Sequence, residues 1–589
     1  MYITDKIETV LASAFCKCGY KGRFTEVNKC KMPELGDYAA VGALACAKEY
    51  HENPREVAAK IAEILKTNEI FSSIRVDGPG FINLKLHDNF IVEAVNKICA
   101  ADFFSSCHKK KEGKIVLDYG GANIAKPLHV GHLRSAIIGE ALKRIARFNG
   151  YDAIGDVHLG DWGLQMGMLL HELSLLHPNW PYFDKNKDSD FPKTSPITVN
   201  DLEELYPLAS KKSKEDQEYL AASRQATFEL QQGRSGYVAL WQHIVDTSIA
   251  DLKQDYDALA VTFDLWLGES DANKYIPELI ARFQKDGFIR QSEGALIIDV
   301  ALKTDKNPMP PVIIQKSDGA ILYHTTDIAT IYQRVKDFNP EFIWYIVDKR
   351  QSLHFEQVFR CAYKTHVAAD NLKLEHIQFG TMNGKDGKPF KTRSGGVLKL
   401  KDLINMVYAK ARERLLAGGY AENLTSAEQE NAALCIGMAA LKFGDLSNLC
   451  AKDYVFDIDK FLDFEGKTGP YLLYSAVRAR SILQKANVDI NQLEKNIVVA
   501  QNIAERNLQI ALIEFSAVTA EAFLKREPKV LCDYGYLIAN LFAQFYAQVK
   551  IITEAHLARR AALLSLVYAF CIIIEKVLEL LGISAPAKM

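Results

Sequence analysis

The segment 118–134 holds the residues whose types and spacing best suit chemistry. Its polar residues, with the small Gly131 between the two histidines, are Asp118, Asn123, Lys126, His129 and His132. Two imidazoles and an ammonium group at the start of a helix can stabilise charge on a phosphate during group transfer. The carboxylate and amide just upstream suit a cationic ligand, so one turn could serve both chemistries. Taken alone, a His-x-Gly-His string also occurs where histidines cap a helix or fill a core.

Tyr323 and Asp327 form a second pair with possible chemistry. They are four residues apart, so on a helix they share one face. A phenol and a carboxylate that converge on a cleft can hold a guanidinium group, whose planar fork favours paired acceptors. Without other information, such a pair is more often a surface or capping pair.

A glycine-flanked basic loop spans 384–396. Its cations, opposed by the single carboxylate of Asp386, are Lys385, Lys388, Lys391 and Arg393. Such a loop could close over a polyphosphate and neutralise a leaving pyrophosphate. The alternative is an exposed basic hairpin.

Aromatic and basic residues recur at helical spacing near the start of the last part of the chain, at Tyr471, Tyr474 and Arg478. Aromatic rings interleaved with arginines can stack on and clamp unpaired bases. The alternative is the core-facing side of an amphipathic helix in a bundle.

The elements around the first turn must hold these residues in place. Ile115–Leu117 is a continuous apolar run typical of a buried parallel strand. From Gly131 onward, apolar residues recur every fourth position until Asn149-Gly150, which predicts a helix and its end. A further short strand is expected at Tyr151–Gly155. This is a strand–helix–strand unit, in which ligands bind at the carboxyl ends of the strands.

Together these motifs resemble class I aminoacyl-tRNA synthetases, and more narrowly the arginyl-tRNA synthetase family. The resemblance starts with the acid, Asn, Ala-Lys, His-x-Gly-His and Leu-Arg-Ser of segment 118–135, and further matches cover most of the chain. Gly160–Gln165 resembles a Gly-Asp-Trp-Gly-x-Gln element, although the family's Asn upstream of it is Val157 here. The second class signature, Lys-Met-Ser-Lys-Ser, is absent, and Phe390–Gly395 stands in its place, as in many arginyl family members.

The resemblance implies a Rossmann-like α/β catalytic domain of the class I type, with an N-terminal α+β domain and a C-terminal all-α helical bundle. The expected boundaries are 1–110 for the tRNA-contacting N-terminal domain, 113–400 for the catalytic domain with an insertion around 170–290, 401–455 for a helical connector and 456–589 for the anticodon-binding bundle.

The resemblance also implies an activity: ATP and L-arginine form arginyl-adenylate, and arginine then passes to the 3′-terminal adenosine of tRNA(Arg). The expected ATP-binding residues are His129, Gly131, His132, Lys385 and Lys388, with His129, His132, Lys126, Lys391 and Arg393 as catalytic residues. The expected arginine-binding residues are Asp118, Asn123, Tyr323, Asp327 and Gln351. The expected tRNA-binding residues are Tyr471, Tyr474, Arg478, Tyr546 and Met589. Lys126 is our candidate to replace the lysine missing from the second signature.

We expect Mg2+ on the phosphates of ATP, no metal bound by the protein itself, and a cytoplasmic monomer. The chain has 589 residues, ordinary apolar (48%) and charged (24%) content and a net charge of -2, so any nucleic-acid-binding surface must be local. The first residues do not read as a signal peptide, and the apolar run Ala561–Ile574 reads as a buried helix too short to span a bilayer. The eleven cysteines are scattered and are expected to be reduced.

Two other functions are compatible with parts of this pattern. A smaller nucleotidylyltransferase shares the turn with two histidines, but it needs neither the aromatic C-terminal region nor the long insertion. A tRNA-binding protein without catalysis would not need His129, His132, Lys126 and the basic loop together.

Overall fold

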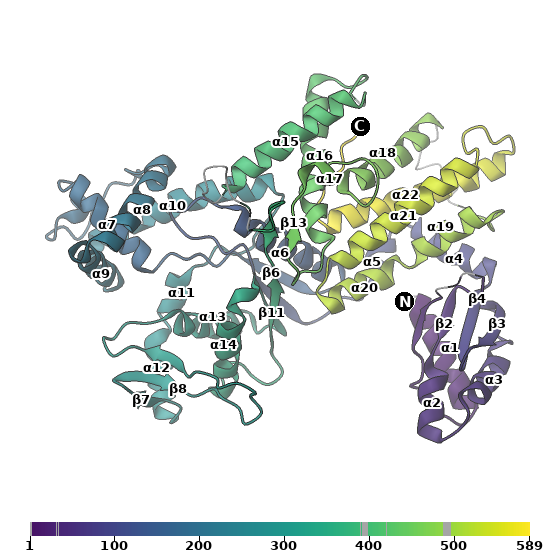
Figure 1. Cartoon of the computed structure of the whole chain (residues 1–589), viewed down its shortest axis with the longest axis horizontal. Coiled ribbons are helices and arrows are strands. Elements are labelled where there is room, and N and C mark those ends of the chain that lie inside the picture. Colours follow the sequence, from purple (N-terminus) through teal and green to yellow (C-terminus); the bar gives the residue numbers. More distant parts are fainter. Residues whose placement is uncertain are drawn as a thin grey trace.

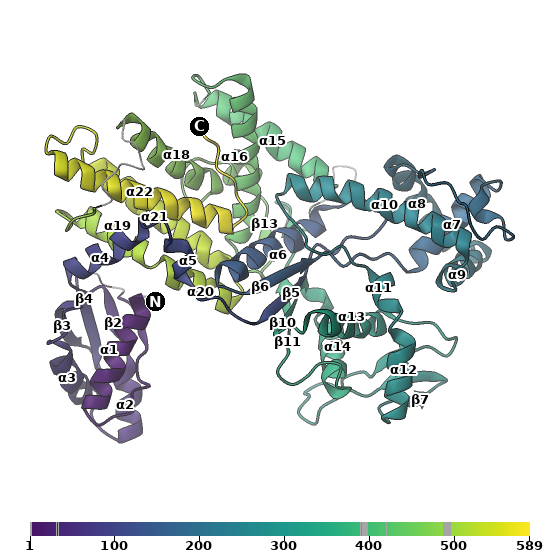
Figure 2. The same ribbon diagram turned by 180° about the vertical axis from the view of Figure 1, so that it is seen from behind.

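The computed structural model describes residues 3–30, 32, 34–388, 390, 398–419, 421–486 and 496–589. The molecule is elongated, with a helical insertion at one end, a parallel sheet near the middle and a separate N-terminal region at the other end (Figure 1). The C-terminal helices lie between the sheet and the N-terminal region in both ribbon views (Figure 2).

The N-terminal region is an antiparallel sheet of four strands, in the order β1-β2-β4-β3, covered by helices. Its elements are α1 (Ile3–Lys17), β1 (Val27–Lys29), β2 (Tyr38–Ala40), α2 (Gly42–Tyr50), α3 (Pro54–Leu65), β3 (Phe71–Asp77) and β4 (Phe81–Leu86). The hairpin of β3 and β4 turns through Gly78 (φ 59°) and Gly80 (φ 130°), conformations that favour glycine. Helices α4 (Asp88–Ile98) and α5 (Phe103–Cys107) lead onward. The predicted α+β region is confirmed.

A four-stranded parallel sheet in the order β11-β10-β5-β6 forms the centre of the molecule. Its strands are β5 (Lys114–Asp118), β6 (Asp152–Asp156), β10 (Phe342–Asp348) and β11 (Lys373–Phe379). The helices packed with it are α6 (Val130–Phe148), α13 (Tyr323–Phe338) and α14 (Ser352–Lys364). Ile115, Val116 and Leu117 of β5 are completely buried, as the apolar run predicts. The predicted Rossmann-like domain is confirmed.

The order of the strands defines where a ligand should bind. Strand β5 continues through α6 to β6 on one side, whereas β10 continues through α14 to β11 on the other. The connections therefore leave in opposite directions between β5 and β10. Ligands of such sheets bind at this switch point, outside the carboxyl ends of the strands.

The segment between β6 and α13 is a helical insertion followed by a small antiparallel sheet. Its elements are α7 (Leu164–Leu176), η1 (Pro181–Phe183), α8 (Val199–Glu215), α9 (Gln217–Gln231), α10 (Ser235–Ala258), α11 (Glu269–Asn273), α12 (Ile276–Lys285), β7 (Arg290–Ser292), β8 (Ala295–Ile298) and β9 (Val312–Gln315). The sequence predicts the polar helices but not the sheet, because strands of three or four residues are too short to show a clear alternation.

Helices dominate the rest of the chain. The elements are η2 (Lys349–Gln351), β12 (Met382–Asn383), α15 (Leu400–Ala417), α16 (Ser426–Leu446), β13 (Tyr454–Val455), α17 (Ile458–Phe461), α18 (Gly469–Lys485), α19 (Ile503–Ile513), α20 (Phe515–Lys525), α21 (Lys529–Gln548) and α22 (Leu557–Leu580). The predicted helical C-terminal bundle is confirmed. All eleven cysteines are free thiols, as expected.

Helix α22 corrects one expectation. The apolar run looked too short to cross a membrane, but the helix has 24 residues and is long and apolar enough by length and composition. Its most apolar window is 72% buried, and it packs against α18 and α21. This burial is typical of the core helix of a folded domain. The expectation of a buried helix is therefore supported, whereas the expectation that the helix is too short to span a bilayer is wrong.

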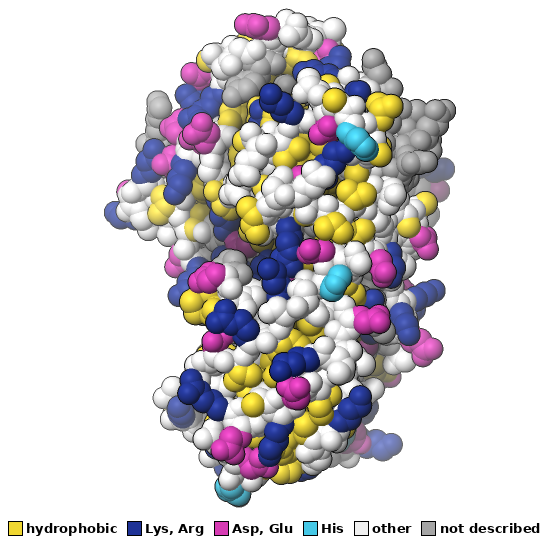
Figure 3. Space-filling model, turned by 90° about the vertical axis from the view of Figure 1, so that its right-hand side faces the viewer, with side chains coloured by type: hydrophobic (Ala, Val, Ile, Leu, Met, Phe, Trp, Pro, Cys, Tyr) yellow, Lys and Arg dark blue, Asp and Glu magenta, His cyan; other side chains and the backbone are white. Residues whose placement is uncertain are grey.

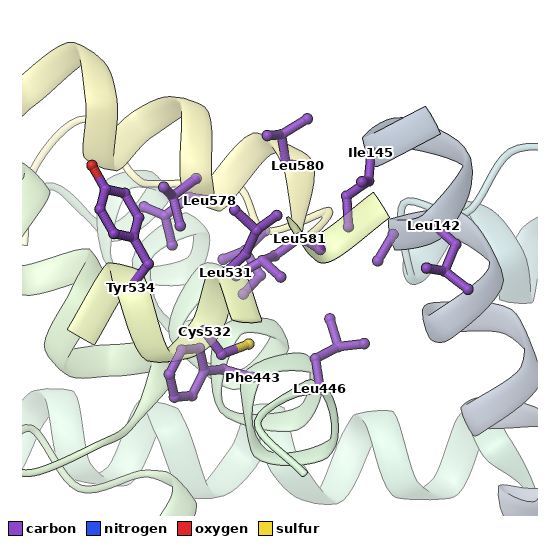
Figure 4. Close-up of a cluster of buried hydrophobic side chains, with 14 of the residues drawn as sticks. Leu142, Ile145, Phe443, Leu446, Leu531, Cys532, Tyr534, Leu578, Leu580 and Leu581 are labelled. Atoms are coloured by element: carbon purple, nitrogen blue, oxygen red, sulfur yellow. The ribbon is translucent and has the colours of Figure 1, made fainter. Parts of the chain in front are cut away.

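Helix α6 is packed into this C-terminal region. Figure 4 shows Leu142 and Ile145 of α6 beside apolar side chains of α16 and α21, including Leu446 and Leu531, and beside Leu581, the residue after α22. The helix that follows the chemistry-bearing turn is therefore supported on one side by the sheet and on the other by the C-terminal helices.

Candidate active site

The turn between β5 and α6 lies at the switch point of the sheet and is fixed by backbone geometry. Gly120 (φ 97°) and Gly121 (φ 63°) adopt left-handed conformations. The amide of Gly120 donates to Ser135 Oγ (2.8 Å), and that hydroxyl donates to the carbonyl oxygen of Ile346 in β10 (2.7 Å). Asn123 forms a β-bridge with Gly160 after β6. The turn is thus tied to both strands that flank β5.

His129 and His132 lie at the start of α6, where each ring accepts a backbone hydrogen bond. His129 is the N-cap; its Nδ1 accepts from the Gly131 amide (3.0 Å), and His132 Nδ1 accepts from the His129 amide (3.0 Å). The ring centroids are 3.9 Å apart. Because Nδ1 accepts in both rings, each neutral imidazole carries its proton on Nε2. The pair therefore offers two N–H donors beside a helix N-terminus.

The imidazoles are neutral donors rather than cations. Burial, together with the neighbouring His129, lowers the pKa of His132 to about 3, and burial and the charge of Lys126 lower the pKa of His129.

Gly131 also has a role that the sequence did not reveal. A Cβ at this position would lie 2.7 Å from His129 Cε1, so glycine leaves room for the folded imidazole. Its expected role in ATP binding stays a prediction.

Lys126 follows Ala125, which has a left-handed backbone (φ 62°). The Lys126 ammonium group lies 4.5 Å from the ring centroid of Tyr206 in α8. Its charge acts on both imidazoles, so the predicted cation lies within electrostatic reach of the predicted phosphate site.

Asp118 at the end of β5 is buried and already has a guanidinium partner. Arg334 of α13 donates to Asp118 Oδ2 (2.8 Å) and to Asp156 Oδ2 (2.7 Å). Burial raises the pKa of Asp118 despite the opposing charge of Arg334. This internal ion pair was not foreseen, and it makes Asp118 less available to a substrate than the sequence suggests.

Tyr323 and Asp327 lie on the first turns of α13, as their spacing predicts. Tyr323 is 68% exposed, and Asp327 Oδ2 is 2.5 Å from His354 Nε2. Gln351 is exposed at the end of η2, directly after β10. Tyr323 and Asp327 therefore lie on a helix that packs against the sheet, and Gln351 follows the central strand β10.

Glu269 is a carboxylate at this edge that sequence reasoning missed. It begins α11, and burial raises its pKa to about 7, with His158 opposing and Asp161 and Asp327 reinforcing the shift. In the sequence it is indistinguishable from an acidic residue in the first turn of any helix. No local pattern would have marked it.

His158 follows β6, and its Nδ1 lies 4.0 Å from Asp156 Oδ2. Its imidazole opposes the burial that raises the pKa of Asp118 and of Glu269, and its two buried ring nitrogens have no hydrogen-bond partner among the described residues. Its backbone is left-handed (φ 41°), so the ring is fixed by an unusual turn after β6. Gln165, from the same motif, donates to the Gly160 carbonyl oxygen (2.5 Å) and closes that turn.

The residue that follows the basic loop, Leu398, is hydrogen-bonded to the start of the helix that carries the histidines. Lys385 pairs with Asp457 (3.3 Å), and the Gly384 amide donates to the Lys388 carbonyl oxygen (2.8 Å). Lys391 and Arg393 lie outside the described residues. Past them, the Val130 amide donates to Leu398 (3.1 Å), which fastens the end of the loop beside the histidines.

The C-terminal aromatic residues form a separate group on α18 and α21. The guanidinium of Arg478 lies 5.2 Å from the ring centroid of Tyr474 and 4.7 Å from that of Tyr546. Tyr471 is less available, because its hydroxyl donates to Asn540 Oδ1 (2.8 Å). Met589 is half-buried against the bundle.

Within the described residues, no group of three or more His, Cys, Asp and Glu side chains is arranged to hold a metal ion.

Three family models match the chain. They are an arginyl tRNA synthetase N-terminal domain at residues 1–86, a class I (R) tRNA synthetase catalytic domain at 94–458 and a DALR anticodon-binding domain at 472–589.

Curated proteins named arginine–tRNA ligase are similar over the full length. That of Alkaliphilus oremlandii is 47% identical over 591 residues and that of Francisella tularensis subsp. novicida 46% over 595, with 100% of both chains covered. Among solved structures, arginyl-tRNA synthetase of Plasmodium falciparum matches with a TM-score of 0.83 and 25% identity, over 100% of this chain and 99% of that one. The Thermus thermophilus enzyme, at 22% identity and a TM-score of 0.78 with 100% of both chains covered, shares the fold.

Proposed function

The chain belongs to the arginyl-tRNA synthetase family, and we propose that it activates L-arginine with ATP and transfers the arginyl group to the terminal adenosine of tRNA(Arg). The single observation that carries this proposal is the pairing of two sites at one switch point. Neutral imidazole donors and a lysine lie in the turn after β5, and Glu269 follows the segment that is bridged to the end of β6 and lies within electrostatic reach of Asp327.

We assign the phosphates of ATP to the start of α6. The Nε2–H groups of His129 and His132 would donate to oxygens around the α-phosphate, beside the positive end of the helix dipole. Since both rings are neutral, they stabilise developing negative charge by hydrogen bonds, and Lys126 supplies the positive charge. Lys385 and Lys388, with Lys391 and Arg393, would neutralise the leaving pyrophosphate.

We assign the arginine side chain to Asp327, Tyr323, Gln351 and Glu269. A guanidinium presents five donors in one plane, so several acceptors around it are needed. Asn123 would bind the backbone of the amino acid. Asp118 would act partly through its ion pair with Arg334, which joins the guanidinium-binding helix α13 to β5 and β6.

Mg2+ would enter on the phosphates of ATP and would help to neutralise them. Because no cluster of three or more potential metal ligands is present among the described residues, we assign it no protein ligands and no step.

We propose that tRNA binds along the molecule. The N-terminal domain (1–110) would contact the body of the tRNA, and Tyr474, Arg478 and Tyr546, with Tyr471 and Met589 nearby, would contact the anticodon. We propose that the protein acts as a monomer. We propose a cytoplasmic location, where tRNA and ATP are found together.

ATP–pyrophosphate exchange tests this function. Exchange that depends on arginine, measured with and without tRNA(Arg), is the expected result. Exchange with a different amino acid, or no exchange under either condition, would contradict the proposal.

Lys126→Ala tests the assignment of the transition-state cation. We expect kcat for exchange to fall on the order of 100-fold or more, as loss of a charge-stabilising group does, while the Kd for arginine stays unchanged. Lys126→Arg keeps the charge and should retain part of the rate. A near-normal kcat for the alanine variant would remove Lys126 from the mechanism.

A further inference from the structure

The turn that carries Lys126 is held by the insertion as well as by the sheet. The amide of Ala125, in its left-handed conformation, donates to Ser248 Oγ of α10 (3.0 Å). That hydroxyl in turn donates to the Ile244 carbonyl oxygen of its own helix (2.7 Å). Helix α10 therefore fixes the backbone immediately before Lys126.

Helix α8 contacts the segment at the other end of the same turn through a partly exposed ion pair. Glu203 pairs with Lys399 (2.9 Å), and Lys399 forms a backbone bridge with His129. In both ribbon views, α8 and α10 lie side by side and α10 extends toward the parallel sheet (Figures 1 and 2). The insertion is thus fastened to the segments on both sides of Lys126.

The turn around Lys126 meets α8 at a cavity of about 340 Å3, lined by Ala125 and Pro127 of the turn and by Asn200, Glu203, Tyr206 and Pro207 of α8. Among the described residues, no ion pair holds the Lys126 ammonium group, and its contact is with the Tyr206 ring at 4.5 Å from the ring centroid. Tyr206 therefore both lines this cavity and contacts the lysine.

Tyr206 also reaches the arginine side of the site. The pKa of Tyr323 is raised by the burial of part of its side chain, by Glu269 and by the Tyr206 phenol, so the two phenols lie within electrostatic reach of each other. Lys126 acts on His129 and His132 in the same way. One ring of the insertion therefore contacts the predicted catalytic cation and lies within electrostatic reach of a residue of the predicted guanidinium site.

We infer that Tyr206 is a positioning residue for Lys126: its ring holds the ammonium group, by cation–π attraction, in the orientation from which it reaches the α-phosphate. The inference rests on the catalytic role proposed above for Lys126. It makes the insertion part of the adenylate-forming machinery, because a shift of α8 would carry the ring and the lysine together.

Three variants of Tyr206 and Lys126 test this in the full-length protein. Tyr206→Leu should lower kcat for ATP–pyrophosphate exchange about 2- to 30-fold, the range of cation–π energies, with the KM for arginine unchanged. Tyr206→Phe keeps the ring face and should retain most of the rate. In a Lys126→Ala background, Tyr206→Leu should have no further effect. Phe228→Leu, at an exposed aromatic of the neighbouring helix α9, is the matched control.

The outcomes separate the two proposals. If Lys126→Ala is slow but Tyr206→Leu keeps the normal kcat, the positioning role is overturned and the role of Lys126 stands. If Tyr206→Leu slows exchange equally with and without Lys126, the ring acts by another route and the inference is wrong. If Lys126→Ala has normal kcat, both proposals fail. Thermal melts of each variant identify any loss that reflects unfolding.

Discussion

At the scale of single residues, protonation decides what each side of the site can do. The two imidazoles accept backbone hydrogen bonds through Nδ1 and are neutral at physiological pH, so they act as donors of fixed orientation. Glu269 is different, because burial raises its pKa to about 7. A carboxyl with this pKa is only partly ionised at neutral pH, and a guanidinium cation requires its ionised form.

The pH dependence of arginine binding follows from Glu269. Below about pH 7 the carboxyl is protonated and above it is ionised, so the KM for arginine should fall as pH rises from 6 to 8. Glu269→Gln should raise the KM on the order of 10- to 100-fold, since a charge-assisted bond is lost, and should flatten this pH dependence. Measurement of KM at each pH in wild type and variant checks this. A KM that is independent of pH in the wild type would contradict it.

Local patterns predicted residues near one another in sequence and missed partners far apart. The turn of Asn123, Lys126, His129 and His132 could be predicted because a strand, a turn and a helix follow one another there. Arg334 could not, because its bonds to Asp118 and Asp156 join residues 216 and 178 positions apart. Nothing in a helix such as α13 reveals that one of its arginines is buried between two distant carboxylates.

At the scale of elements, α6 links the catalytic turn to the C-terminal helices. Its Arg134 is buried, and its Nε donates to Asp445 Oδ2 of α16 (2.9 Å). Its Nη1 also donates to the carbonyl oxygens of Gly380 (2.8 Å) and Lys452 (2.9 Å). The apolar periodicity of α6 predicted a helix with a buried side. The sequence did not reveal that Arg134 is buried as well and pairs with Asp445.

Breaking this ion pair should destabilise the junction. Arg134→Met leaves Asp445 as an unpaired buried charge, which typically costs about 3–5 kcal/mol. The urea midpoint of the catalytic region should fall accordingly. Arg134→Met combined with Asp445→Leu removes both charges and should recover more than half of the loss. A double variant no more stable than the single one would show that the carbonyl contacts, and not the charge pair, matter.

At the scale of the whole molecule, the N-terminal region is fixed to the C-terminal helices rather than to the sheet. Arg506 of α19 donates to both oxygens of Asp37 (2.8 and 2.9 Å) and to Asp88 (3.0 Å). Across the same junction, the Lys29 ammonium group (2.7 Å) and the Tyr38 hydroxyl (3.0 Å) donate hydrogen bonds to the Glu514 carboxylate.

On the end face in Figure 3, basic side chains gather at mid-height, between the upper and lower parts of the molecule, among acidic and apolar ones. With a net charge of -2 for the chain, such local groups are where tRNA phosphates would be met.

Arg506 should therefore set the geometry with which both ends of the molecule meet one tRNA. Arg506→Ala leaves Asp37, whose side chain is only 9% exposed, without its partner, so the N-terminal domain should lose its fixed position. We expect a higher KM for tRNA(Arg), unchanged KM values for arginine and ATP, and faster hydrogen exchange in β2 and α19. Lys29→Ala is the control, because its partner pair is largely exposed on the lysine side (52%) and such pairs contribute little. Equal effects of the two variants on the KM for tRNA would mean that the junction acts through its overall charge; no effect of Arg506→Ala would mean that tRNA itself, once bound, orders the two domains.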